Sequence, residues 1–127
     1  MIITQVVPPY DRTDLPTVKL CREALARYMG NTDPSFVSLE GFVDAMVLVD
    51  ALRDAGCDLT RDKPISALLS IDRKDIGLGP NLLLSFSPTN HKGLDSVYGT
   101  VIQGGRRAVI GKDWKELSKD WAKRYGD

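Results

Sequence analysis

The sequence predicts an α/β protein whose strands lie towards its two ends and whose middle is helical. Three observations lead to this fold class. The run "IITQVV" at residues 2–7 has the β-branched composition of a strand. Apolar residues then recur at helical spacing through residues 16–70. Towards the C-terminus, two β-branched runs flank the glycines of residues 104–105, which is typical of a β-hairpin.

The first two elements are a short buried strand and a surface helix. The strand at 2–7 ends at a pair of prolines, which cannot donate to a sheet. The helix is predicted from Pro16 to Met29, and Gly30 stops it. Its apolar stripe consists of Val18, Cys21, Leu25 and Tyr28. Charged residues occupy the other side, so this helix is amphipathic.

The second helix is apolar around most of its circumference. Ser38 is predicted at or near its N-cap, and Gly56 is its C-terminal stop. The apolar side chains between them are Leu39, Phe42, Val43, Ala45, Met46, Val47, Leu48, Val49, Ala51 and Leu52. Such a helix needs cover on most sides, and a chain of 127 residues has few other elements to provide it. We therefore expect part of its cover to be missing.

The third helix is shorter and leads into a glycine-rich loop. It is predicted from about Asp62 to Ser70, capped by Thr60 or Asp62, with Pro64 in its first turn. The loop "KDIGLGP" has its glycines in the wrong order for a nucleotide-binding motif. "NLLLSF" then predicts a strand at 81–86.

The last elements are a hairpin and a terminal helix. The hairpin spans residues 96–110, and Gly99 in mid-strand predicts a close backbone approach or a bulge. In the helix at 112–127, Asp113 and Glu116 have the spacing of a capping box. Its apolar stripe consists of Trp114, Leu117, Trp121 and Tyr125.

Composition excludes several function classes. Seventeen basic side chains balance seventeen acidic ones, so no net field attracts nucleic acid or an anionic membrane. No apolar run reaches the roughly 18 residues that a membrane-spanning helix needs, and the N-terminus lacks a signal peptide pattern. Cys21 and Cys57 fit no metal or redox motif and are interpreted as free thiols, although an oxidising compartment would allow a disulfide. We expect no metal and no cofactor.

The segment "FSPTNHKGLDSVYGTVIQGGRR" contains the single histidine, His91, close to serines and an aspartate. It lacks a nucleophile-elbow pattern, so no catalytic residue is predicted. Ser87, Thr89 and Asn90 are instead turn formers whose side chains bind local backbone, and Gly93 permits positive φ. His91 is then a solvent-facing loop residue.

Three segments, taken in order along the chain, resemble parts of a known protein family. "TQVVPPYD", then "SLEGFVDAMVLVDALRDAG", then "SFSPTNHKGLDSVYGTVIQGGR" resemble the C-terminal portion of type I periplasmic binding proteins. These are the solute receptors of ABC transporters in the branched-chain amino-acid group. The resemblance implies a C-terminal fragment of a two-lobed fold, in which three crossing segments join the lobes and the ligand binds between them.

The resemblance also divides the chain, which we interpret as one partial domain. Residues 1–78 are similar to a late part of the N-terminal lobe, and within them residues 2–7 are similar to the second crossing strand. Residues 79–111 are similar to the third crossing segment and the hairpin that completes the C-terminal lobe. Residues 112–127 form the terminal helix. The apolar helix would then pack on the sheet of the N-terminal lobe, which agrees with its lack of cover.

The ligand-binding residues implied by the resemblance are Phe42, Glu40, Ser38 and Gln5. Phe42 stands where an aromatic side chain contacts the solute in the family, at the start of the apolar helix. Two alternatives stay open, because Phe42 also fits a core position and Glu40 fits a first-turn carboxylate that interacts with the helix dipole. Free N–H groups at a helix N-terminus suit the carboxylate of an amino acid.

The implied function is the solute-binding component of an ABC importer for amino acids or related small carboxylates. As a fragment, the chain is not expected to bind solute alone. An ABC permease is the implied partner of the parent protein, and the periplasm or the cell exterior its location. Two alternatives remain: a homo-oligomeric interaction module, and a sensory piece of a signalling protein.

Overall fold

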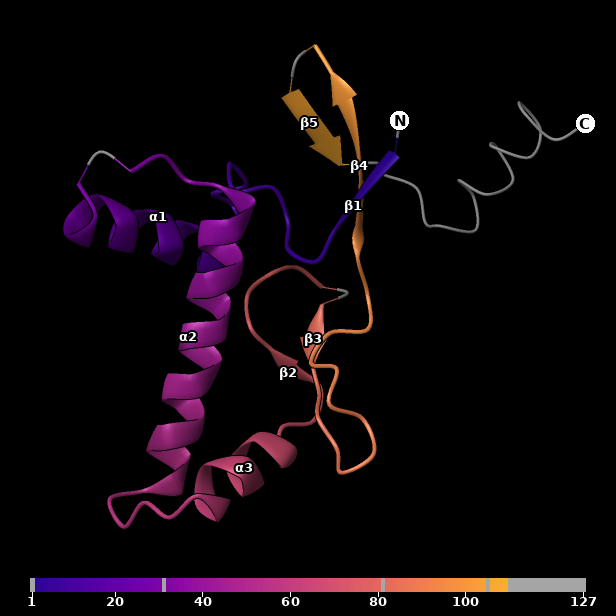
Figure 1. Cartoon of the computed structure of the whole chain (residues 1–127). Helices are drawn as coiled ribbons and strands as arrows, with labels where there is room; N and C mark the ends of the chain where they lie inside the picture. Colours follow the sequence, from indigo (N-terminus) through magenta and orange to yellow (C-terminus); the bar gives the residue numbers. More distant parts are fainter. Residues whose placement is uncertain (1, 31, 81, 105, 110–127) are drawn as a thin grey trace, which may run out of the picture.

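The long helix α2 (Phe36–Ala55) is the element around which the other helices are arranged. In Figure 1, α1 (Pro16–Tyr28) lies near the N-terminal end of α2, and α3 (Asp62–Leu69) lies near its C-terminal end. This computed structural model describes residues 2–30, 32–80, 82–104 and 106–109. The predicted order of strand, three helices and further strands is confirmed over these residues.

Two antiparallel sheets accompany the helices. β1 (Ile2–Gln5), β4 (Tyr98–Gln103) and β5 (Arg106–Val109) form a three-stranded sheet in the order β1-β4-β5. β2 (Lys74–Asp75) and β3 (Leu83–Leu84) form a two-stranded ribbon, which Figure 1 shows between the helices and the chain leading to β4. All strand pairs of the described residues are antiparallel, so neither sheet is the parallel centre of an α/β domain.

The strands are shorter than the sequence predicts. The first strand ends at Gln5 rather than at residue 7, and of the run at 81–86 only Leu83 and Leu84 pair with a neighbour. The register of β1 on β4 is unbroken, with Gly99 opposite Thr4, so the alternative of a bulge at Gly99 is wrong. The predicted hairpin of β4 and β5 is confirmed.

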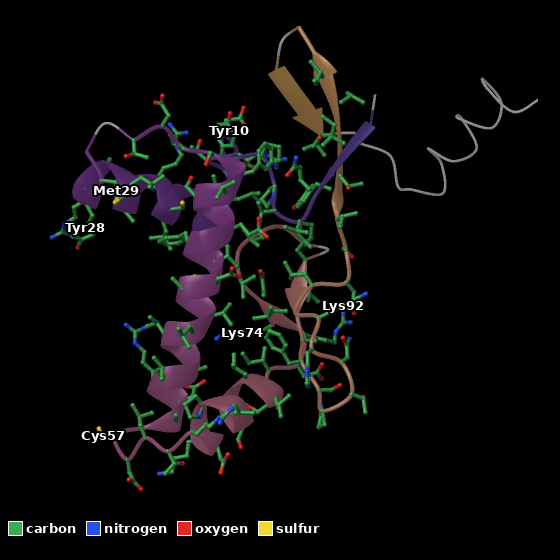
Figure 2. The ribbon with its side chains drawn as sticks, in the orientation of Figure 1. Tyr10, Tyr28, Met29, Cys57, Lys74 and Lys92 are labelled. Atoms are coloured by element: carbon green, nitrogen blue, oxygen red, sulfur yellow. The ribbon has the colours of Figure 1, made fainter. Side chains whose placement is uncertain are left out.

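Helix α1 uses only part of its predicted stripe. Val18 and Cys21 are buried, whereas Leu25 is half-buried and Tyr28 is 73% exposed. Tyr28 and Met29 lie at the end of α1 that is remote from α2 (Figure 2). The prediction that Tyr28 belongs to a buried stripe is therefore wrong, because the last turn of α1 extends past the helix that covers its first turns.

The N-terminus of α2 is capped by two serines. Ser35, not Ser38, is the N-cap, and its Oγ accepts the backbone N–H of Ser38 at 3.1 Å. In return, the backbone N–H of Ser35 donates to Ser38 Oγ at 2.8 Å. This reciprocal arrangement is a capping box, so Ser38 occupies the third helical position. Gly56 ends the helix as predicted, with φ of 77°.

Helix α3 begins without a side-chain cap, so the prediction of Thr60 or Asp62 in that role is wrong. Arg61 precedes the helix and already has helical dihedrals, φ −56° and ψ −35°. A side-chain cap needs an extended residue at this point, which Arg61 does not provide. The helix ends at Leu69, close to the predicted Ser70.

The core lies between α1, α2 and the segment of residues 71–84. Its buried members are Val7, Val18, Cys21, Leu39, Val43, Ile71, Ile76, Leu78, Leu82 and Leu84. The other side of α2 is different, because Val37, Leu48, Val49 and Leu52 are exposed. Within the described residues, the expectation that this helix lacks part of its cover is therefore confirmed.

Two expectations concern long helices. The predicted terminal helix at 112–127, with its stripe of aromatic residues, lies outside the described residues. Among the helices that are described, none is long and apolar enough to cross a bilayer.

Candidate functional site

Three of the four predicted ligand-binding residues lie in the first half of α2, but on different sides of it. Ser38 and Phe42 are four residues apart and share one face of the helix. Glu40 lies about 200° around the helix from each of them, since consecutive residues are about 100° apart. Ser38 and Phe42 are half-buried and Glu40 is exposed, in agreement with this geometry. The structure therefore does not bring the three side chains to one surface.

The side chains of Ser38 and Phe42 have structural partners. Ser38 Oγ donates to the backbone oxygen of Ser35 at 2.9 Å as part of the capping box. Phe42 packs against the buried core cluster. Glu40 is exposed to solvent, and its side chain has no such structural partner among the described residues. Among these three residues, Glu40 is the side chain that is free to meet a ligand.

Gln5, the fourth predicted residue, is at the junction of the three-stranded sheet with the rest of the chain. It is the last residue of β1 and lies opposite Tyr98, the first residue of β4. Its side chain is half-buried. A role for Gln5 in ligand binding stays a prediction, as it does for Phe42, Glu40 and Ser38.

A cluster of polar contacts that the sequence did not predict surrounds the loop of residues 76–79. On one side, the buried Thr17 of α1 donates its hydroxyl to the backbone oxygen of Ile76. On the other side, the Tyr98 hydroxyl donates to the backbone oxygen of Leu78 at 2.5 Å. The two glycines of this loop have positive φ, 70° at Gly77 and 120° at Gly79. The pattern "GLG" was the sequence signal for this tight loop.

Burial raises the pKa of two groups, one in the core and one packed against it. Desolvation raises the pKa of the Tyr98 phenol above its ordinary 10.0, against a smaller lowering effect of the nearby Arg12 guanidinium. Desolvation also raises the pKa of the Cys21 thiol above its ordinary 9.0. The Arg12 guanidinium hydrogen-bonds to both Asp14 oxygens, at 2.7 and 2.6 Å, and lowers the pKa of that exposed carboxylate.

We expect the folded state to lose stability in alkaline solution. A raised pKa means that the folded state holds the proton of the group more tightly than the unfolded state does. The stability that each group contributes is therefore complete below its ordinary pKa and is lost as the pH rises beyond that value. Urea unfolding of the wild type and of Tyr98→Phe between about pH 8 and pH 11 measures the effect. Tyr98→Phe removes the tyrosine part, so its stability should fall less steeply above pH 10.0. If the free energy of unfolding fell equally steeply with pH for the two proteins, the expectation would be contradicted.

The loop around His91 is organised by local turns. The backbone N–H of Asn90 donates to Ser87 Oγ at 3.0 Å, and the backbone N–H of Lys92 donates to Asn90 Oδ1 at 2.9 Å. His91 is exposed, as predicted. Gly93 does not adopt the positive φ that a glycine permits. Its role is steric, because a Cβ there would lie 2.8 Å from the Leu84 side chain.

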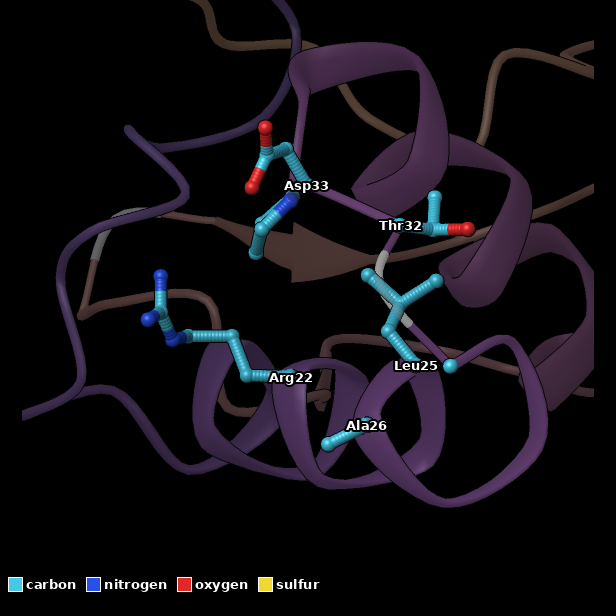
Figure 3. Close-up of a pocket in the computed structure, with 7 residues that line it drawn as sticks. Arg22, Leu25, Ala26, Thr32 and Asp33 are labelled. Carbon is cyan, nitrogen blue, oxygen red and sulfur yellow. The ribbon is translucent and has the colours of Figure 1, made fainter.

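A hollow of about 410 Å³ lies elsewhere, between α1 and the start of the next helix. Figure 3 shows Arg22 and Asp33 on opposite sides of it. Its lining residues are Arg22, Leu25, Ala26, Gly30, Thr32, Asp33 and Pro34. It is open to solvent and contains none of the four predicted ligand-binding residues. We therefore do not assign it as the solute site.

The two cysteines are separate. Cys21 is buried and Cys57 is exposed, and both are free thiols in the structure. The described residues contain no group of three or more histidine, cysteine and acidic side chains that could hold a metal ion.

Two solved structures match this chain. The first is a possible leucine/isoleucine/valine-binding protein from Rhodopirellula baltica SH 1, with a TM-score of 0.78 and 33% identity over 92% of this chain. The second is a substrate-binding periplasmic protein from Ralstonia solanacearum, with a TM-score of 0.72 and 29% identity over 86% of this chain. The chain spans 30% of the length of each. It matches no protein-family model and no curated protein.

Proposed function

Because this chain has the fold of part of a type I periplasmic binding protein, we propose that it is a portion of the solute-binding receptor of an ABC importer. The observation that carries the proposal is the backbone match over nearly the whole chain. The expectation that the chain is not an enzyme agrees with both matches, which are binding proteins. In such a receptor two lobes close on the solute, and the closed form is presented to the permease.

The solute class that we propose is amino acids or related small carboxylates. One matched protein is described as a possible leucine/isoleucine/valine-binding protein, which supports this class. The proposed partner is an ABC permease, and the proposed location is the periplasm or the cell exterior, in line with the periplasmic match. The resemblance in sequence supports a position in the C-terminal portion of the receptor.

Of the four proposed ligand-binding residues, Glu40 is the one whose exposure best suits a direct contact. A carboxylate there would pair with the ammonium group of an amino acid, which is a charge-assisted hydrogen bond. Gln5 is half-buried at the end of β1, where the chain leaves the sheet. Phe42 and Ser38 are proposed to act from the other face of α2, where they also serve the core and the cap.

We expect this chain alone to give no binding heat with micromolar leucine, because most of the matched receptors' length lies outside the match. A chimera in which this chain replaces its counterpart in the Rhodopirellula baltica protein should bind leucine, with the parent receptor titrated in parallel. In the chimera, Glu40→Gln should weaken binding about 10-fold or more. Isothermal titration calorimetry measures all of these affinities.

The matched control is Glu23→Gln, which removes an exposed carboxylate from α1. Glu23 lies 4.0 Å from Lys19 in a solvent-exposed pair, so its loss should change neither folding nor binding. Micromolar binding by the isolated chain would contradict the expectation that the site is incomplete. An equal loss in both variants would contradict the specific role of Glu40, and a chimera that folds without binding leucine would contradict the proposed solute class.

One observation favours a second candidate function, association of copies of this chain. The apolar side chains of Val37, Leu48, Val49 and Leu52 on α2 are exposed, and a patch of this kind is typical of an interface. Light scattering separates the candidates, since a folded dimer that binds no solute favours an interaction module. Neighbouring permease and ATPase genes would favour the importer over a third candidate, a sensory piece of a signalling protein.

A further inference from the structure

The three-stranded sheet and the helices form two bodies that are joined at a narrow junction. We use "helical body" for α1, α2 and α3 with the β2–β3 ribbon and its loop. The chain leaves β1 at Val6 and enters β4 at Val97, next to the Gln5–Tyr98 pair. Val6 is 43% exposed and Val97 is 58% exposed, so neither side chain is packed firmly between the bodies. Figure 1 shows the sheet at one end of the molecule, beyond the ribbon.

Tyr98 is the residue that ties the two bodies together. Its hydroxyl donates to the backbone oxygen of Leu78, 20 residues earlier in the chain. Leu78 is fully buried in the helical body, and the Tyr98 ring packs against the same core. In the described part of the chain, no second side-chain hydrogen bond leads from β1 or β4 to this body.

The two residues that precede Leu78 are themselves held by hydrogen bonds from α1. The side-chain hydroxyl of Thr17, at the start of α1, donates a hydrogen bond to the backbone oxygen of Ile76. The Thr17 backbone N–H donates to the oxygen of Gly77 at 3.3 Å. Gly79 leaves room for the tyrosine, because a Cβ at that position would lie 2.7 Å from the Tyr98 hydroxyl. The loop therefore connects the N-terminus of α1 to the start of β4 through consecutive hydrogen bonds.

We propose that Tyr98 is a positioning residue whose hydroxyl fixes the orientation of the three-stranded sheet on the helical body. Without the hydroxyl, the ring still fills its place in the core, but the exposed connections at Val6 and Val97 allow the sheet a second orientation. The inference rests on contacts within this chain and goes beyond solute binding. In the proposed receptor the same bond would bias the orientation of the lobes, and that extension alone rests on the proposed function.

Spin-label distance measurements on the whole chain test this proposal. Labels on Cys57, which is exposed and follows the C-terminal end of α2, and on Ile102→Cys, which is 56% exposed, report the separation of that end from β4. Cys21 is 3% exposed and should escape labelling in the folded state. In this background we expect one narrow distance distribution. Tyr98→Phe should add a second population, because loss of one hydrogen bond shifts such an equilibrium about 2- to 10-fold.

The matched control is Tyr28→Phe, which removes an exposed hydroxyl from α1 and should leave the distribution unchanged. Circular dichroism on each labelled variant establishes that it is folded. If Tyr98→Phe lowers the melting temperature but keeps the distance distribution of Tyr28→Phe, then Tyr98 only stabilises the fold and the proposal is wrong. Because no ligand is added, this result is independent of the binding experiments.

Discussion

Leu39→Ala is expected to lower the free energy of unfolding by about 2–5 kcal/mol. Leu39 is 1% exposed and belongs to the core between α1, α2 and residues 71–84. Truncation to alanine removes three carbon atoms from that core and leaves a cavity where they packed. For a protein whose total stability is of the order of 5–15 kcal/mol, this is a large fraction. Urea unfolding followed by circular dichroism measures the change.

Leu48→Ala is the matched control, because it is the same substitution on the same helix. Leu48 is 51% exposed, so we expect its truncation to change stability by less than about 0.5 kcal/mol. A cost equal to that of Leu39→Ala would show that the exposed side of α2 is covered in solution, as the association of copies requires. A small cost for both variants would contradict the position of Leu39 in the core.

Gly77→Ala is expected to destabilise the chain by about 1–3 kcal/mol or more. Two causes act together at this position. The φ angle of 70° is unfavourable for a residue with a side chain, and the added Cβ would lie 2.8 Å from Thr17 Oγ1 and 3.3 Å from the Thr17 backbone nitrogen. The loop and the start of α1 must therefore separate. The melting temperature and urea unfolding report the loss.

Gly41→Ala is the control with the opposite expected sign. Gly41 lies inside α2, where an added Cβ would meet no atom within 4 Å, and its φ is not positive. Alanine favours a helix over glycine, so we expect a gain of about 1 kcal/mol. If both substitutions destabilise the chain equally, the effect at Gly77 does not come from its φ angle and its contact with Thr17.

Features specified by neighbouring residues could be predicted from the sequence. Gly56 ends α2 because glycine adopts positive φ at low cost, and this signal is local. The turn at Ser87 and Asn90 likewise depends on side chains that bind backbone two or three residues away. The sequence predicts Ser38 at or near the N-cap of α2, whereas Ser35 is the cap, because both serines are suitable and only the backbone path distinguishes them.

Features that depend on distant contacts could not be predicted. The hydrogen bond from Tyr98 to Leu78 and the contact of Gly77 with Thr17 join segments that are far apart in sequence. The sequence predicts a strand over 81–86, but only Leu83 and Leu84 pair, because β2 offers just two residues for pairing. At the candidate site, helical spacing alone places Glu40 on the opposite side of α2 from Ser38 and Phe42. The hydrogen bonds that hold the Ser38 side chain in the cap could be seen only in the structure.

The pairing of β1 with β4 has a consequence for how the protein is made. Thr100 donates its hydroxyl to the backbone oxygen of Ile3, 97 residues earlier, and this contact is fully buried at Thr100. During synthesis, β1 leaves the ribosome long before β4 does, so β1 cannot pair with β4 during that interval. Closing so long a loop costs little more entropy than closing one of half the length, by about 0.6 kcal/mol. Since Val7 packs in the core beside the helices, we expect this packing to hold the end of β1 near the helical body before β4 pairs with it.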